Sequence, residues 1–208
     1  MTHFRTSLNT VLSNRNLLAV TVTQSLSMFA MFLWRPFWGL YILELDGTKS
    51  ILGSLTALQS LSVLLAQLPG GVLSDRVGRK RIIILSQFAV STASLGYILS
   101  SGFSGVALTR FMGGLGEGLG GNVMGATGGP VWQALVTEIA PAETRGSILG
   151  LMGTLIGFLT TPAPILGGYL YENASPRLPF IASFISGILG CLVFSLWVRE
   201  PERTTREA

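Results

Sequence analysis

The chain has 208 residues, of which 49% are hydrophobic and only 12% are charged, and its mean hydropathy is +0.56. A soluble domain carries about a quarter charged residues, so this composition excludes an ordinary soluble domain and indicates an integral membrane protein. The net charge of +4 does not indicate a nucleic-acid partner, because the cations lie in polar stretches between long apolar runs, where membrane orientation accounts for them.

The apolar runs predict six membrane-spanning helices, since each span needs roughly 20 apolar residues. They are expected over residues 16–43, 50–72, 81–100, 105–137, 147–170 and 180–198, with a polar lead-in at 1–15 and a charged tail at 199–208. Prolines predict kinks at Pro36, near Pro130 and at Pro162. Cys191 stands alone, so no disulfide forms within the chain, and no cleavable signal is expected. The predicted fold class is all-α, an integral membrane domain of six transmembrane helices.

The charges of the loops predict how the helices are oriented. With the N-terminus inside, the outer side receives only Lys49 and Arg177. The inner side receives Arg5, Arg15, Arg76, Arg79, Lys80, Arg81, Arg145, Arg199, Arg203 and Arg206. Because positive charge is retained on the cytoplasmic side, both termini are expected in the cytoplasm and the protein in the plasma membrane.

Three ionisable side chains lie inside the predicted spans: Arg35 in the first, and Arg110 and Glu117 in the fourth. Arg110 and Glu117 are seven residues apart and therefore share one helix face. At about 1.5 Å per residue, Arg110 lies roughly 8 Å from the outer side, Arg35 roughly 12 Å and Glu117 roughly 18 Å. Arg35 is therefore expected to reach toward Glu117 if the first and fourth helices face each other.

An ionisable residue in a membrane span is costly and is a functional candidate by default. Glu117 is predicted to load and release a proton, while an arginine tunes its proton affinity or holds an anionic group of the substrate. The alternative is a static buried ion pair that only fixes helix packing. Function is favoured because these are the only charges at mid-membrane, but both interpretations stay open at this point.

The densest cluster of charge joins the second and third predicted helices, in the sequence Gly71-Val72-Leu73-Ser74-Asp75-Arg76-Val77-Gly78-Arg79-Lys80-Arg81. Gly78 is expected to let the backbone turn tightly, and Asp75 to accept from an arginine or to cap a helix end. This stretch resembles Gly-x-Leu-x-Asp-Arg-x-Gly-Arg-Lys, the signature of the loop between helices 2 and 3 in the major facilitator superfamily, with every fixed position filled. A generic positive loop would explain the cations but not the spacing of its two glycines and its aspartate.

The resemblance implies that this loop helps to lock the outward-facing state, with Gly71, Asp75, Arg76, Gly78, Arg79 and Lys80 as the gating residues. Arg110 and the glycines after it are similar to the arginine–glycine motif in helix 4 of the same superfamily, whose arginine is associated with proton coupling. Glu117 has no fixed counterpart in that motif, so its role depends on the physical argument alone.

The segment from Glu138 to Gly146 resembles the inner loop between helices 4 and 5 of the superfamily. Glu138 and Arg145 are expected to join Asp75 and Arg79 in an ionic cluster on the cytoplasmic face. Among the remaining motifs, Gly116-x-Gly118-x-x-Gly121 matches a dinucleotide fingerprint, but no strand precedes it, so a dinucleotide site is rejected. Glycines at four-residue spacing instead predict close helix–helix contact.

The resemblance covers essentially the whole chain, but it corresponds to one six-helix half of a twelve-helix transporter. It implies transport of a small solute by alternating access, driven by a proton gradient, in the lipid bilayer. The missing half would come from a second copy or from a separately encoded chain. The rival interpretation is a non-transporting membrane subunit or a truncated remnant. An enzyme is disfavoured, and no cofactor or metal is predicted, because the sequence offers no metal-ligand cluster and no nucleophile–base pair.

Overall fold

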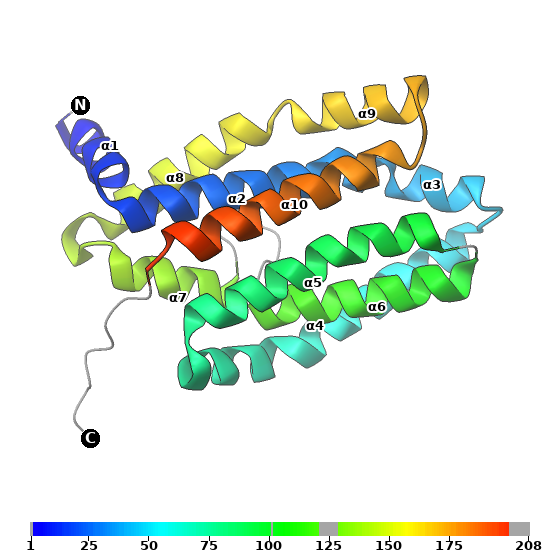
Figure 1. Cartoon of the computed structure of the whole chain (residues 1–208), viewed down its shortest axis with the longest axis horizontal. Helices are drawn as coiled ribbons and strands as arrows, with labels where there is room; N and C mark the ends of the chain where they lie inside the picture. The colour runs from blue at the N-terminus through cyan, green and yellow to red at the C-terminus, as the bar shows by residue number, and fades with distance from the viewer. Residues whose placement is uncertain (1, 101, 121–128, 200–208) are drawn as a thin grey trace.

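The computed structural model of the chain describes residues 2–100, 102–120 and 129–199, and nearly all of them are helical. The elements in chain order are α1 (Thr2–Ser13), α2 (Arg15–Trp34), the 3₁₀ turn η1 (Arg35–Phe37), α3 (Trp38–Glu44), α4 (Lys49–Val77), α5 (Arg79–Leu99), α6 (Phe103–Gly120), α7 (Pro130–Ile139), η2 (Ala142–Thr144), α8 (Arg145–Thr160), α9 (Ala163–Asn173) and α10 (Leu178–Trp197). The long helices lie along one another (Figure 1). We call the end at which α4 meets α5 the Gly78 end, and the opposite end, at which α3 meets α4, the Asp46 end.

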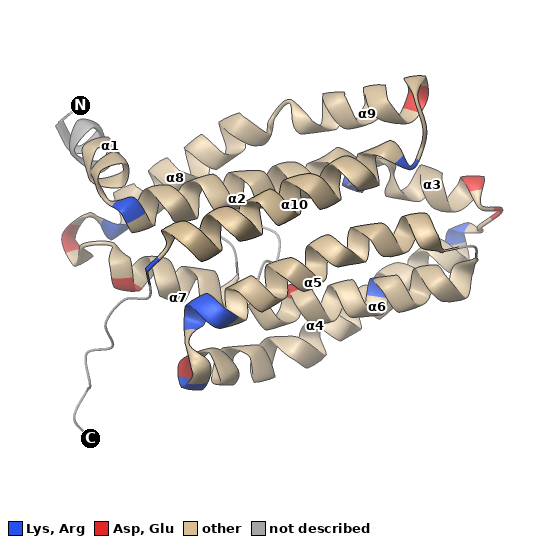
Figure 2. Ribbon diagram, in the orientation of Figure 1, with Lys and Arg blue, Asp and Glu red and all other residues tan. Residues whose placement is uncertain are grey.

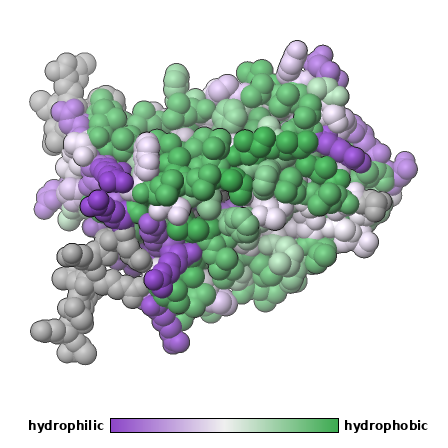
Figure 3. All heavy atoms as spheres, viewed as in Figure 1, coloured by the Kyte–Doolittle hydropathy of each residue, from purple (hydrophilic) through white to green (hydrophobic). Residues whose placement is uncertain are grey.

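Five of the described segments are long and apolar enough to cross a membrane. They are Arg15–Glu44, Lys49–Val77, Arg79–Leu99, Ala142–Asn173 and Leu178–Trp197. α6, which carries Arg110 and Glu117, packs along α4 and α5 and is the sixth helix of the bundle. Figure 2 shows charged residues mainly at the two ends of the bundle, and Figure 3 shows an apolar belt between them. The chain is therefore a multi-pass integral membrane protein.

The turn between α4 and α5 is tighter than the predicted loop. The sequence predicts that the second span ends at residue 72 and the third begins at residue 81, but α4 continues to Val77 and α5 begins at Arg79. Residues 73–77 contain no glycine or proline, so nothing in them ends the helix. Gly78 alone separates the two helices, at φ 113° and ψ 137°, a conformation that residues with a Cβ rarely adopt.

Prolines divide two of the spans. In the first, η1 contains Pro36 and separates α2 from α3. In the fifth, Pro162 lies between α8 and α9. Both breaks occur where the sequence predicts a kink, because proline lacks the amide that would bond to the preceding turn. The predicted fourth span, 105–137, corresponds to α6 and α7, and α7 begins at Pro130; residues 121–128, which include Gly121, lie outside the described residues.

The predicted lead-in contains a helix. α1 packs against α8, where Val11 is fully buried in an apolar cluster and Leu8 packs against that cluster. The Asn14 side chain then accepts hydrogen bonds from the backbone amides of Asn16 and Leu17, at 3.0 and 3.2 Å, and so caps the start of α2. Of the predicted tail at 199–208, only Arg199 lies within the described residues.

The interior of the bundle is apolar toward both ends and polar in the middle. One apolar cluster, around Trp132 and Phe194, lies toward the Gly78 end, and a second, around Trp38 and Phe180, lies toward the Asp46 end. On α5, every buried residue between these two clusters is polar: Ser86, Gln87, Ser91 and Ser94. Ser86, Gln87 and Ser94 each hydrogen-bond to another helix, so this polar middle layer connects α5 to its neighbours.

Close packing of α4 on α6 gives a first testable expectation. A Cβ added at Gly70 would lie 2.7 Å from Leu119 Cα, whereas one added at Gly53, on the same helix, would meet no atom within 4 Å. We expect Gly70→Ala to lower the free energy of unfolding by about 1–3 kcal/mol, because backbone atoms cannot move aside. We expect Gly53→Ala to raise it by about 0.5–1 kcal/mol, through helix propensity. Unfolding titrations in detergent micelles measure both values, and equal values for the two variants would contradict this packing.

Candidate functional site

An open groove of about 510 Å³ runs between α2, η1 and α3 on one side and α4 and α6 on the other. Its wall contains all three ionisable residues that the sequence places at mid-membrane, Arg35, Arg110 and Glu117. The polar residues that α4 adds to the wall are Thr56, Gln59, Ser60 and Gln67. Because they recur at helical spacing, they form one face of α4. The groove therefore brings the three predicted intramembrane residues to one space, with Arg35 on one side and Arg110 and Glu117 on the other, next to the polar face of α4.

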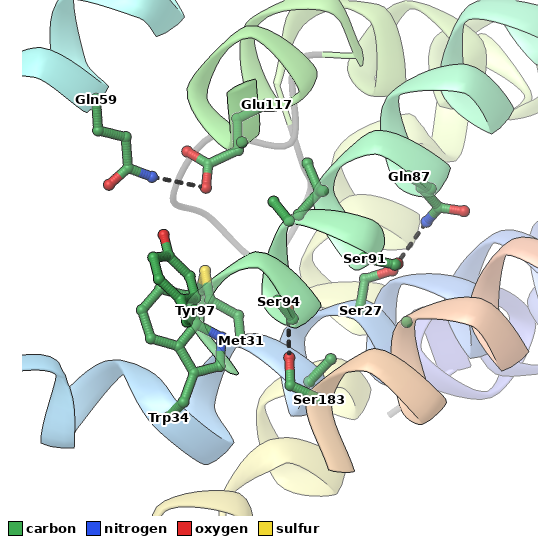
Figure 4. Close-up of a pocket in the computed structure, with 15 residues that line it drawn as sticks. Ser27, Met31, Trp34, Gln59, Gln87, Ser91, Ser94, Tyr97, Glu117 and Ser183 are labelled. Carbon is green, nitrogen blue, oxygen red and sulfur yellow. Dashed lines mark hydrogen bonds between the residues drawn. The ribbon is translucent and has the colours of Figure 1, made fainter. Parts of the chain in front are cut away.

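Gln59 lies between Glu117 and Arg110. Its Nε2 donates a hydrogen bond to Glu117 Oε1 at 2.9 Å (Figure 4), and its Oε1 accepts a hydrogen bond from Arg110 Nη1. The two charged groups are thus joined through one amide and not directly. Gln59 is not among the site residues predicted from the sequence, although the sequence holds one signal for it: Gln59 and Gln67 are the only two glutamines in the predicted span 50–72.

Arg35 does not make the contact that the sequence suggested. Its side chain is exposed in η1 at the rim of the groove, and its Nη1 donates to Met31 Sδ at 3.2 Å. The helix rotation that places Glu117 next to Gln59 leaves Arg35 across the groove, without a hydrogen bond to that carboxylate. Arg35 is therefore an exposed cation at the rim of the groove, while Arg110 is the arginine that is linked to Glu117 through Gln59.

The guanidinium of Arg110 is held among aromatic rings. Its Cζ lies 3.6 Å from the ring centroid of Trp38, 5.4 Å from that of Trp34 and 5.8 Å from that of Tyr97. The residue is only 5% exposed. Tyr97 is held in place by Tyr41, whose hydroxyl donates a hydrogen bond to the backbone carbonyl of Tyr97 at 2.8 Å. Aromatic faces attract a cation and exclude water, so this cage replaces the solvation that the buried guanidinium has lost.

A second cavity of about 50 Å³ adjoins the groove, and Met31, Trp34, Gln59 and Glu117 line both spaces (Figure 4). Serines and a glutamine line it: Ser27, Gln87, Ser91, Ser94 and Ser183. Gln87 Nε2 donates to Ser27 Oγ at 2.8 Å, and the hydroxyls of Ser94 and Ser183 are 3.3 Å apart. A buried water needs roughly 10–15 Å³, so this polar space has room for a few.

Glu117 lines both the groove and the cavity, and it is the charged residue that the two linings share. The groove offers it two arginines, and the cavity offers it neutral hydroxyl and amide groups. This position lets one carboxyl group meet a cationic environment on one side and a neutral polar environment on the other. In the described part of the chain, no three His, Cys, Asp or Glu side chains lie close enough together to hold a metal ion.

At the Gly78 end, Arg79 forms two ion pairs. Its guanidinium lies 3.7 Å from Asp75 and 2.6 Å from Glu138. The pair with Glu138 ties the α4–α5 turn to the end of α7. Of the predicted four-residue cluster, Arg145 makes a different bond: its Nη2 donates to the carbonyl of Thr137 at 2.8 Å. That carbonyl is in the last turn of α7, where helix carbonyls lack partners and a cation is favoured.

The other predicted gating residues lie around this network. Arg76 is exposed in the last turn of α4, and Lys80 is half-buried in the first turn of α5. Gly78 forms the turn itself, whereas Gly71 lies within α4, where a Cβ would meet no atom within 4 Å. The two glycines of the motif therefore have different roles. Gly78 is needed for the turn, whereas no contact among the described residues requires a glycine at Gly71.

Comparisons with known proteins identify the family of the chain. Residues 20–208 match the family model described as Major Facilitator Superfamily. The chain is 31% identical over 173 residues to the quinolone resistance protein NorA of Staphylococcus aureus, across 82% of this chain and 42% of that protein. It is 25% identical over 179 residues to an uncharacterized MFS-type transporter of Methanocaldococcus jannaschii, across 86% of this chain and 44% of that protein.

Among solved structures, the human organic anion transporter MFSD10 (TETRAN) aligns with a TM-score of 0.64 at 18% identity, over 89% of this chain and 47% of that chain. This likeness concerns the fold, and it matches the predicted half of a twelve-helix transporter. The chain spans about half the length of the curated relatives it matches. Because the family model covers nearly the whole sequence, the chain belongs to the major facilitator superfamily of membrane transporters.

Proposed function

We propose that the chain forms one half of a secondary transporter that moves a small solute by alternating access and is driven by a proton gradient. The observation that carries this proposal is that Glu117 lines both a groove with two arginines and an adjoining polar cavity whose other lining residues are uncharged. An ionised carboxylate is favoured beside arginines, and a protonated one in a neutral environment. A carboxyl group at such a boundary is suited to bind and release a proton.

The groove lies within one half of the twelve-helix architecture, so a transport path needs a second surface opposite it. In this class of transporter the substrate site lies between two halves near the bilayer midplane. We propose that the second half is either another copy of this chain or a separately encoded chain. Native mass spectrometry of the protein in lipid nanodiscs separates these, because a dimer supports the first and a monomer the second.

The ionic network at the Gly78 end is proposed as the gate. Arg79 pairs with Asp75 near the end of α4 and with Glu138 near the end of α7. It therefore connects the α4–α5 turn to α7. When the two halves rock, this end must separate from or meet the opposite half, and the Asp75 side chain is 70% exposed at this end. The excess of positive charge at this end supports a cytoplasmic location for it in the plasma membrane.

The choice of a first substrate comes from the relatives. NorA is named as a quinolone resistance protein, and the lining of the groove here includes two tryptophans, an exposed arginine and a carboxyl group. Such a lining suits an aromatic solute that carries charged groups. We propose export of a compound of this kind and use a labelled quinolone as the first probe.

The rival function is a non-transporting membrane subunit with structural charges. Transport in proteoliposomes separates the two: an imposed proton gradient is expected to drive quinolone movement by the wild-type protein. We expect Glu117→Gln to reduce gradient-driven transport to the level of empty liposomes, because the amide cannot carry the proton. Glu172→Gln, an exposed carboxylate at the Asp46 end, is the matched control and is expected to retain transport. Unchanged transport in Glu117→Gln would remove the proton-carrier role.

A further inference from the structure

The Gln59 side chain is oriented by its two charged partners. A guanidinium has only donors, so the oxygen of the Gln59 amide must face Arg110. An ionised carboxylate has only acceptors, so the amide nitrogen must face Glu117. Both bonds are charge-assisted and are therefore about twice as strong as neutral hydrogen bonds. The result is a continuous chain, Glu117–Gln59–Arg110, in which one amide is held from both sides.

This orientation depends on the charge of Glu117. A protonated carboxyl group has a donor as well as acceptors, so it no longer requires the nitrogen of Gln59 and no longer strengthens that bond by charge. The polarisation that the carboxylate passes through the amide to its oxygen is lost at the same time. Arg110 then keeps a weaker acceptor, and the aromatic cage is its main remaining contact.

We propose that Gln59 is the positioning residue that transmits the protonation state of Glu117 to the guanidinium of Arg110. The proposal takes from the proposed function only that Glu117 binds the proton. When Glu117 is ionised, Gln59 holds Arg110 over Trp38; when Glu117 is protonated, Arg110 is released to bind an anionic group in the groove. Proton binding thus changes the charge that the groove presents to a solute.

The surroundings of Glu117 support a relay through Gln59. The charged and titratable groups that line the two spaces with it are Arg35 from η1, Arg110 from α6 and Tyr97 from α5. α4 contributes the Gln59 amide and no charged group to these walls. Arg35 bonds to Met31, so within this site the amide is the direct bonded route from the carboxyl group to an arginine.

Tryptophan emission provides the test, because Trp34 and Trp38 flank Arg110. In a background with Trp132→Phe and Trp197→Phe, we expect the emission of these two residues to change reversibly with pH. Glu117→Gln should abolish the change, and so should Gln59→Met, which keeps the side-chain size but cannot bridge the two groups. Gln59→Leu also cannot bridge the two groups, and it takes the place of Gln59→Met if that variant does not fold. Gln67→Met, two turns further along the same wall, should keep the wild-type response.

The outcomes separate the relay from the proposed function. A full pH response in Gln59→Met that Glu117→Gln still abolishes would overturn the relay and leave Glu117 as the proton site. A response that survives Glu117→Gln, or no response in the wild-type background, would also overturn the relay. Proton-driven transport by the same proteins then decides on the proposed function separately, since transport that depends on Glu117 would support it without the relay.

Discussion

Replacement of Arg110 by leucine is expected to lower the free energy of unfolding by about 3–5 kcal/mol, whereas Arg35→Leu should change it by less than about 0.5 kcal/mol. Arg110 is buried in the aromatic cage and bonded to Gln59, so its loss leaves the Gln59 oxygen without its donor and removes the cation that is linked through Gln59 to the Glu117 charge. Arg35 is exposed and bonds only weakly, to a thioether sulfur.

A double-mutant cycle shows how much of this loss comes from the charge on Glu117. Unfolding is measured in detergent micelles for Arg110→Leu, for Glu117→Gln and for both together. We expect Arg110→Leu to cost about 0.5–3 kcal/mol less in the Glu117→Gln background, because the uncompensated charge is then absent. Equal costs in the two backgrounds would mean that Arg110 only packs against the aromatic rings and is not coupled to the carboxyl group.

Arg110→Lys adds a test of geometry at constant charge. Lysine keeps the cation but has neither the planar face that stacks on Trp38 nor the fork that reaches Gln59. If the planar shape of the guanidinium is what stabilises the cage, Arg110→Lys should lower the free energy of unfolding about as much as Arg110→Leu does. If only the positive charge matters, Arg110→Lys should leave the free energy of unfolding nearly unchanged. The structure favours the first outcome, since the guanidinium lies 3.6 Å from the ring centroid.

Much of the architecture was predictable from the sequence, because it follows from solvation. Long apolar runs must be helices in a bilayer, since each backbone amide needs an internal partner there. Prolines such as Pro36 and Pro162 mark the breaks because they lack that amide. The family could also be inferred, since the signature around Asp75 fixes residue types at defined spacings.

The site was predictable only in part, because pairwise contacts depend on helix rotation. Hydropathy does not show which way α6 turns, so the sequence suggested Arg35 as the partner of Glu117 where the structure has Gln59. It also suggested a polar loop from residue 73 onward. Asp75 and Arg76 are compatible with a helix, so polarity alone does not end α4, and the end is set by the backbone conformation of Gly78.

The two glycines of the α4–α5 signature are expected to respond in opposite ways to the same substitution. Gly78→Ala should lower the free energy of unfolding by about 1–3 kcal/mol, because alanine is strained at φ 113°. Gly71→Ala should leave it unchanged or raise it by about 0.5–1 kcal/mol, because Gly71 is within a helix and an added Cβ meets no atom within 4 Å. Unfolding titrations of both variants in micelles measure the difference, and similar losses would contradict the turn geometry.

Transport by Gly71→Ala then tests whether a second half packs against α4 at this position. Next to Gly71 on α4, Leu68 is 77% exposed and Val72 is 48% exposed, so this is a bare apolar surface on which a glycine allows close approach. If a second half packs there during transport, Gly71→Ala should lower transport although the folded half is as stable as before. Gly53→Ala, equally open on the same helix, is the control and should transport normally. If lipid alone covers this face, a methyl group at Gly71 would cost nothing, and normal transport by Gly71→Ala would place the second half elsewhere.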